Sequence, residues 1–175
     1  MARVVALLRG VNVGGRRLAM ATLRDGLARA GCDRVETYVQ SGNVVLVPPE
    51  PAPDDLAGWL EARIGELAGF PVPVVLRTAA ELAAVVAASP YPQAGGAQLH
   101  VSFYREAPVD LLAGIDLAAF APGHATLVGR DLYLHLPDGM GRAALPAALA
   151  RAGGTATTRN WNTVLRLAEL AASST

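Results

Sequence analysis

The sequence contains no lysine, because all fifteen of its basic residues are arginine. This absence excludes a lysine nucleophile, a Schiff base and the lysine of a phosphate-binding loop. Cys32 is the only cysteine, so the chain cannot form a disulfide within itself. We expect Cys32 to be a small packed residue, the alternative being a reactive thiol.

Long apolar runs are also absent. No run approaches the roughly 20 residues that a membrane-spanning helix needs, and the opening MARVVALLRG is interrupted at Arg9 too early for a signal peptide. We therefore expect a cytoplasmic protein with no membrane partner. Hydrophobic residues make up 52% of the 175 residues and charged residues only 17%, which predicts a folded core.

The balanced net charge of zero is unevenly distributed. Residues 1–34 contain seven arginines and two acidic residues, a net charge of +5, and residues 142–175 contain four arginines and one acidic residue, a net charge of +3. Residues 35–141 contain four arginines and twelve acidic residues, a net charge of −8. The basic ends favour an anionic partner, although arginines that solvate a helix face would explain the same pattern.

The apolar pattern predicts an α+β fold with two lobes. Residues 3–8 form a buried strand, a helix runs from Met20 to about residue 30, and a hairpin covers 35–47. A helix over about 55–68 and a strand at 72–76 complete the order β-α-β-β-α-β, the ferredoxin-like plan. A capping box at Thr78 and Glu81 then begins a helix that ends near residue 88.

Residues 89–96 read as a connector, which predicts lobes at 1–90 and 97–175. The second, smaller lobe repeats the order β-α-β-β-α: a strand at 98–104, a helix at 109–120, a hairpin over 126–136 and a helix at 142–152. A final helix from Thr158 to about Ala172 is expected to pack back on the first lobe.

The ferredoxin-like plan brings two polar segments together. Its first two strands are parallel, so the loop RGVNVGG (9–15) and the turn QSGN (40–43) lie at the same edge of the sheet. The loop leads into a helix, where glycines, main-chain amides and Arg9 or Arg16 suit an anion. The loop matches neither G-x-G-x-x-G nor G-x-x-x-x-G-K-[ST], so ligand binding and a purely structural role of Asn12 remain open.

A third polar segment, TTRNWNT (157–163), begins the final helix in this scheme. Thr157 or Thr158 caps the helix, Trp161 anchors it in the core, and three polar side chains gather in one turn. They bind a ligand or satisfy main-chain groups of the first lobe. The three histidines show no metal spacing, although His100 and His135 lie on separate strands that could meet, and Ser41 has no motif-linked base. We expect no metal and no cofactor.

These segments carry a family resemblance. ALLRGVNVGG, MATLRDGLARAGCDRVETYVQSGNVVL, PVPVVLRTAAEL and TTRNWNTVLRLAEL resemble the bacterial family known as domain of unknown function 1697. The resemblance implies a two-lobed α+β fold with a ferredoxin-like first lobe. It points to no particular activity, because none is established for the family, so no catalytic residue can be assigned. Usual members carry lysine in or just after the first loop, where this chain has Arg16 and Arg17. The candidate ligand-binding residues are Arg9, Asn12, Gly14, Gly15, Arg16, Gln40, Ser41, Asn43, Arg159, Asn160 and Asn162.

The sequence favours a module that binds a small anionic ligand, including phosphate-bearing ones, where the three segments meet. A nucleic-acid-binding protein is one alternative, but the first and third strands lack aromatic residues for base stacking and the pI of 6.8 is not basic. A hydrolase that uses Ser41 or a histidine of the second lobe is another. In the last alternative all three motifs are structural. The oligomeric state is open.

Overall fold

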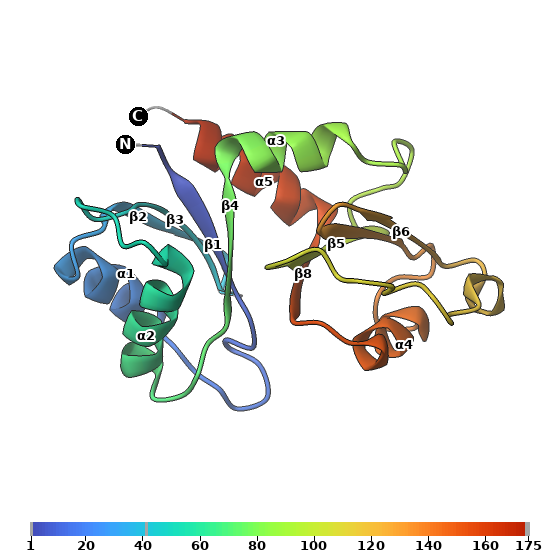
Figure 1. The fold of residues 1–175 in the computed structure, drawn as a ribbon, viewed down its shortest axis with the longest axis horizontal. Coiled ribbons are helices and arrows are strands. Elements are labelled where there is room, and N and C mark those ends of the chain that lie inside the picture. Colours follow the sequence, from blue (N-terminus) through green and yellow to red (C-terminus); the bar gives the residue numbers. More distant parts are fainter. Residues whose placement is uncertain (1, 41, 174–175) are drawn as a thin grey trace. The chain divides into compact units, whose positions relative to one another are not determined.

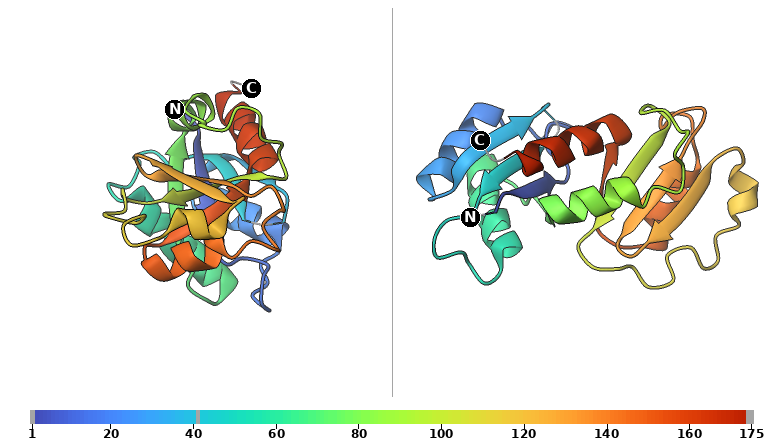
Figure 2. Two further views of the ribbon diagram at one scale, coloured as in Figure 1. Left: turned by 90° about the vertical axis from the view of Figure 1, so that its right-hand side faces the viewer. Right: turned by 90° about the horizontal axis from the view of Figure 1, so that it is seen from above.

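The computed structural model describes residues 2–40 and 42–173. The chain divides into two compact units, residues 1–83 with 167–175, and residues 84–166. Each unit contains a four-stranded antiparallel sheet, so the predicted α+β class is confirmed. The division falls within α3 (Ala79–Ala87) and within α5 (Trp161–Ala172), each a continuous helix (Figure 2). No helix among the described residues is long and apolar enough to cross a membrane.

The first sheet has the strand order that the sequence predicts. Its strands are β1 (Val4–Leu8), β2 (Asp33–Tyr38), β3 (Asn43–Val47) and β4 (Val74–Thr78), in the order β2-β3-β1-β4. β3 is antiparallel to both β1 and β2, so β1 and β2 run in the same direction and end at one edge. The helices α1 (Met20–Arg29) and α2 (Leu56–Ala68) pack on one face of this sheet (Figure 1).

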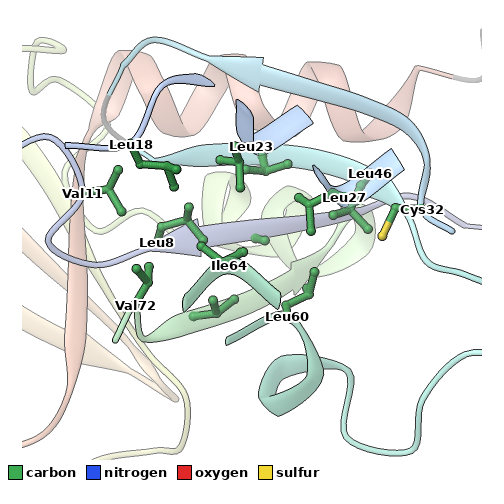
Figure 3. Close-up of a cluster of buried hydrophobic side chains, with 13 residues drawn as sticks. Leu8, Val11, Leu18, Leu23, Leu27, Cys32, Leu46, Leu60, Ile64 and Val72 are labelled. Atoms are coloured by element: carbon green, nitrogen blue, oxygen red, sulfur yellow. The ribbon is translucent and has the colours of Figure 1, made fainter. Parts of the chain in front are cut away.

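The core of the first unit lies between this sheet and its two helices (Figure 3). Leu23 and Leu27 of α1 and Leu60 and Ile64 of α2 are fully buried, as their helical spacing predicts. Each such side chain stabilises the fold by about 1.5–3 kcal/mol relative to an exposed position. The core therefore fixes the end of β1, and with it the start of the loop that follows.

Local signals in the sequence set the helix ends. Gly31, with φ 94°, follows α1, and the amides of Gly31 and Cys32 donate to the carbonyls of Ala28 and Leu27 at 3.0 Å each, the pattern of a Schellman motif. Asp55 caps α2 by accepting from the amide of Gly58 at 2.9 Å. Gly31 and Asp55 therefore end α1 and begin α2 through local hydrogen bonds.

The second unit repeats the strand order of the first. Its sheet contains β5 (Leu99–Tyr104), β6 (His124–Val128), β7 (Asp131–His135) and β8 (Ala156–Asn160), in the order β6-β7-β5-β8. A 3₁₀-helix, η1 (Leu117–Phe120), precedes β6, and α4 (Leu145–Ala152) precedes β8. The strands and the final helix of the predicted recurrence are present, and the likeness extends to a fourth strand and to the strand pairing.

Two expected elements of the second unit are wrong. The helix expected at 109–120 is reduced to η1, because Asp110 and Gly114 have φ of 52° and 80°, which no right-handed helix allows. The final helix begins at Trp161 rather than at Thr158. Residues 156–160 instead pair with β5 as an edge strand, which suits the β-branched Thr157 and Thr158.

The fourth strand of each sheet carries a buried arginine at the same place. Arg77 on β4 pairs with Val5 of β1, and Arg159 on β8 pairs with Val101 of β5. Each Nη1 donates to the carbonyl of the preceding residue, at 2.8 Å for Arg77 and 2.9 Å for Arg159. In each unit the strand ends one residue later and a helix follows, so Arg159 belongs to a repeated structural device.

Candidate functional site

Asn12 fastens the loop that follows β1. Its Oδ1 accepts from the amide of Leu18 at 2.9 Å, and its Nδ2 donates to the carbonyls of Leu18 at 3.0 Å and Gln40 at 2.7 Å. Its φ is 57°, a left-handed conformation that asparagine tolerates better than most residues. The bond to Gln40 confirms that the loop and the β2–β3 turn are neighbours. All three bonds of Asn12 serve the fold.

Gly14 and Gly15 form the tip of this loop. The amide of Arg16 donates to the carbonyl of Val13 at 3.0 Å, and the glycines have φ of 55° and 82°, as a type I′ turn requires. A Cβ on either glycine would meet nothing within 4 Å. The glycines therefore supply turn geometry at a tip that is open to solvent.

Three arginines of the loop are exposed: Arg9, Arg16 and Arg17. Arg16 folds back, with its Cζ 5.4 Å from the ring centroid of Phe70 and its Nη1 3.4 Å from an ideal Cβ on Gly10. Within residues 2–40 and 42–173, none of the three forms a salt bridge. Arg17 and Phe70 were missing from the sequence candidates. Arg17 could have been included because it directly follows Arg16 in the sequence. Phe70 could be found only from the fold, which brings it to Arg16.

The turn QSGN holds the end of β1 from the other side. The carbonyl of Gly42 accepts from the amide of Leu8 at 2.8 Å. Asn43 is fully buried, pairs with Leu7, and donates from Nδ2 to the carbonyl of Tyr38 at 3.0 Å across the hairpin. Asn43 is therefore a structural residue. Ser41, the proposed nucleophile, lies outside the described residues.

The segment TTRNWNT belongs to the second unit, where Arg159 is buried in the sheet. Its Nη1 donates to Thr157 Oγ1 at 2.6 Å and to the carbonyl of Thr158 at 2.9 Å. Burial lowers the pKa of Arg159 to about 10. The Arg159 side chain is therefore buried. Thr157 and Thr158 lie within β8 and cap no helix, contrary to expectation.

Asn160 performs the capping that was expected of the threonines. Its Oδ1 accepts from the amide of Thr163 at 2.9 Å, three residues into α5. Asn162 is exposed and lies against Gly96, where an added Cβ would fall 2.4 Å from its Cγ. Because β8 ends at Asn160, Arg159 and Asn162 do not share a helical turn.

Other reactive groups give no catalytic constellation. Burial, followed by the charge of Asp33, raises the pKa of Cys32 to about 11, so the packed-residue prediction agrees with its environment. Burial also lowers the pKa of His100. Nowhere in the described part of the chain do three or more His, Cys, Asp or Glu side chains gather in a metal-binding arrangement.

The structure thus defines an α+β protein of two units with the same strand order, whose first unit presents a basic, internally fastened loop. A family model described as "Protein of unknown function (DUF1697)" matches residues 1–133. The chain belongs to this family, which confirms the resemblance that its motifs carry.

One similar solved structure is that of the conserved bacterial protein SP0830 from Streptococcus pneumoniae. It has a TM-score of 0.70 and 20% sequence identity, and the match covers 99% of each chain. At this identity the likeness concerns the fold alone. No curated protein matches the chain.

Proposed function

We propose that the loop at residues 9–17 binds the phosphate group of a small anionic ligand through Arg9, Arg16 and Arg17. The observation that carries this proposal is three exposed guanidinium groups on one short loop, without an ion-pair partner in the described residues. Residues 9–24 contain no acidic residue, so the field at the loop is cationic. Guanidinium forks bind phosphate through paired hydrogen bonds, without the missing lysine.

The loop is preorganised for such a contact. Asn12 fastens both its ends, Arg9 donates its amide to the carbonyl of Pro73 at 3.0 Å, and Arg16 rests over Phe70. A loop that is already ordered loses less conformational entropy on binding, which strengthens the complex. The turn at Gly14 and Gly15 is itself uncrowded, since a Cβ on either glycine would meet nothing within 4 Å.

The loop has the residues for binding and none for acid–base chemistry. The sequence RGVNVGGRR contains no Asp, Glu, His, Cys, Ser or Lys. General acid–base or nucleophilic catalysis needs at least one such group within hydrogen-bond reach of the substrate. A ligand-binding role therefore fits this loop better than a hydrolase active site.

A stacking surface for nucleic acid has little support in the central strands of the second sheet. Phe103 of β5 and Tyr133 of β7 are 0% and 1% exposed. Bases stack on exposed aromatic rings, which these two side chains do not provide. Single-stranded RNA nevertheless belongs in the binding experiment, because arginines attract any polyphosphate.

The test measures the affinity of the full chain for a panel of nucleotides and phosphorylated metabolites, with dicarboxylates and a short RNA included, by calorimetry at fixed salt. Arg9→Ala, Arg16→Ala and Arg17→Ala should each weaken binding of the best phosphate ligand about tenfold, since a lost charge-assisted hydrogen bond costs about 1.5 kcal/mol. Arg29→Ala is the matched control, because Arg29 is exposed at the far end of α1.

Three outcomes count against the proposal. One is a panel with no saturable ligand. A second is equal loss of affinity in Arg29→Ala, which would indicate a general effect of charge. The third is preferential binding of the RNA with a steep dependence on salt, which would assign the arginines to nucleic acid.

A further inference from the structure

His124 and His135 are neighbours across two strands of the second sheet. They pair directly in the register of β6 and β7, their ring centroids are 6.3 Å apart, and the ring planes differ by 9°. β6 is the outermost strand of the sheet, and His124 is exposed. From the sequence, His100 and His135 were the histidines that could meet, and no metal was expected. In the structure His135 pairs with Leu99, the neighbour of His100, and with His124.

A tyrosine holds one of the two imidazoles in place. The ring of Tyr91 stacks on His135 with a centroid distance of 5.3 Å, and the Tyr91 hydroxyl shares a 2.8 Å hydrogen bond with Thr126 Oγ1. Thr126 lies two residues from His124 on β6, so its side chain is on the same face of the sheet. His135 is therefore positioned between Tyr91 and His124, while His124 keeps the rotational freedom of an exposed side chain.

We propose that His124 and His135 chelate one divalent transition-metal ion on the outer edge of the second sheet. Imidazole nitrogen is a preferred ligand of Zn²⁺, Ni²⁺ and Cu²⁺. Two nitrogens bound to one tetrahedral zinc at about 2.0–2.1 Å lie about 3.3 Å from each other. Directly paired residues have Cβ atoms about 4.5–5.5 Å apart, so rotation of the exposed His124 side chain brings its ring nitrogen within that separation.

This site is open rather than enclosed. No third His, Cys, Asp or Glu in the described residues joins the pair, so water or an outside ligand completes the coordination. A two-residue site on adjacent strands binds the folded chain better than the unfolded chain, since only folding brings the two imidazoles together. Metal binding therefore stabilises the pairing of β6 with β7 and raises the melting temperature.

The chain contains its own control histidine. His100 is the one remaining histidine of the sequence and is 8% exposed. It pairs with Leu134 and Asn160 rather than with His124 or His135. The experiment titrates Zn²⁺ into the full chain and into His124→Gln, His135→Gln, the double variant and His100→Gln. Binding is followed by calorimetry, and the ring nitrogens by NMR.

The expected result is one Zn²⁺ per chain, with the ring signals of His124 and His135 changing together. His124→Gln and His135→Gln each weaken binding at least tenfold, and the double variant is little worse than either, because one chelate has been lost. The melting temperature rises with Zn²⁺ in the native chain and in His100→Gln, but not in His124→Gln. Because the ligands must be neutral imidazoles, affinity falls as pH falls.

The proposal is overturned if His124→Gln binds Zn²⁺ as the native chain does. It is also overturned if the ring signals of His124 and His135 change at different Zn²⁺ concentrations, because each histidine would then bind zinc on its own. His124→Gln replaces an exposed side chain, so a folded variant is available even if His135→Gln disturbs the stacking with Tyr91.

Discussion

Replacement of Gly42 by alanine is expected to lower the free energy of unfolding by about 3–4 kcal/mol. Gly42 has φ 77°, where an added Cβ costs about 1–2 kcal/mol in backbone strain. That Cβ would also lie 2.8 Å from the Cβ of Leu8, on the central strand β1. Leu8 cannot move aside, because its amide is bonded to the carbonyl of Gly42. Urea denaturation of the purified chain measures the change.

Gly14→Ala is the matched control for Gly42→Ala. Gly14 also has a positive φ, 55°, but a Cβ there meets nothing within 4 Å. The control therefore retains the backbone strain and omits the steric conflict, and its expected cost is about 1 kcal/mol. Equal costs for the two variants would show that the contact between the QSGN turn and β1 is not tight.

Replacement of Asn12 by alanine is expected to cost about 3 kcal/mol. It removes three hydrogen bonds and leaves the amide of Leu18, a residue only 3% exposed, without its partner. It also leaves alanine at φ 57°. Denaturation measures the stability, and hydrogen exchange of the Leu18 amide reports whether the loop end has opened.

Asn12→Gly separates the side-chain contribution of Asn12 from the backbone contribution. Glycine removes the same hydrogen bonds but adopts a positive φ without strain, so its cost should be about 1 kcal/mol less than that of alanine. If Asn12→Ala changed stability by less than about 0.5 kcal/mol, as an ordinary surface substitution does, the fastening role of Asn12 would be wrong.

The meeting of the loop with the QSGN turn could be predicted from the sequence, and the reason is topological. Apolar periodicity identified β1, β2 and β3, and the ferredoxin-like plan then put the ends of β1 and β2 at one edge. The hydrogen bond from Asn12 to Gln40 confirms that inference. The sequence could not say what the side chains do there, since a glycine-rich loop serves a ligand or a turn with the same residue types.

The second unit was harder to predict because its local signals conflict with its pairing. Thr157 and Thr158 precede an apolar helix and resemble caps in the sequence. In the structure they instead pair with β5 as part of β8. A strand five residues long with charged and polar positions has no clear period of its own. The strand β8 could have been predicted only by comparing the two units. Their strand order is the same, and Arg159 takes the place in β8 that Arg77 has in β4.

Two features of the loop region do not follow from local sequence preferences. Phe70 reaches Arg16 only through the packing of α2 and the segment before β4. Val39 has φ 50° and is 51% exposed, an arrangement that β-branched residues rarely adopt. Val39 directly follows Tyr38, the last residue of β2, which pairs with Asn43 of β3.

Neighbouring residues of the loop and of the QSGN turn have different tasks in the proposed function. Asn12, Gly14, Gly15 and Asn43 build and stabilise the loop and the turn, whereas Arg9, Arg16 and Arg17 are exposed, and in the proposed function they bind the anionic group. This division separates stability from affinity. Substitutions of the fastening residues should lower both, and substitutions of the arginines should lower affinity alone.

The most direct test of that division is a backbone NMR titration of the native chain with inorganic pyrophosphate. We expect saturable shifts concentrated in the amides of residues 9–17. These shifts should be lost in an Arg9→Ala/Arg16→Ala/Arg17→Ala variant whose spectrum and urea midpoint remain native. Saturable shifts elsewhere in the chain, unchanged in that variant, would contradict anion binding by these arginines, as would the absence of any saturable shift.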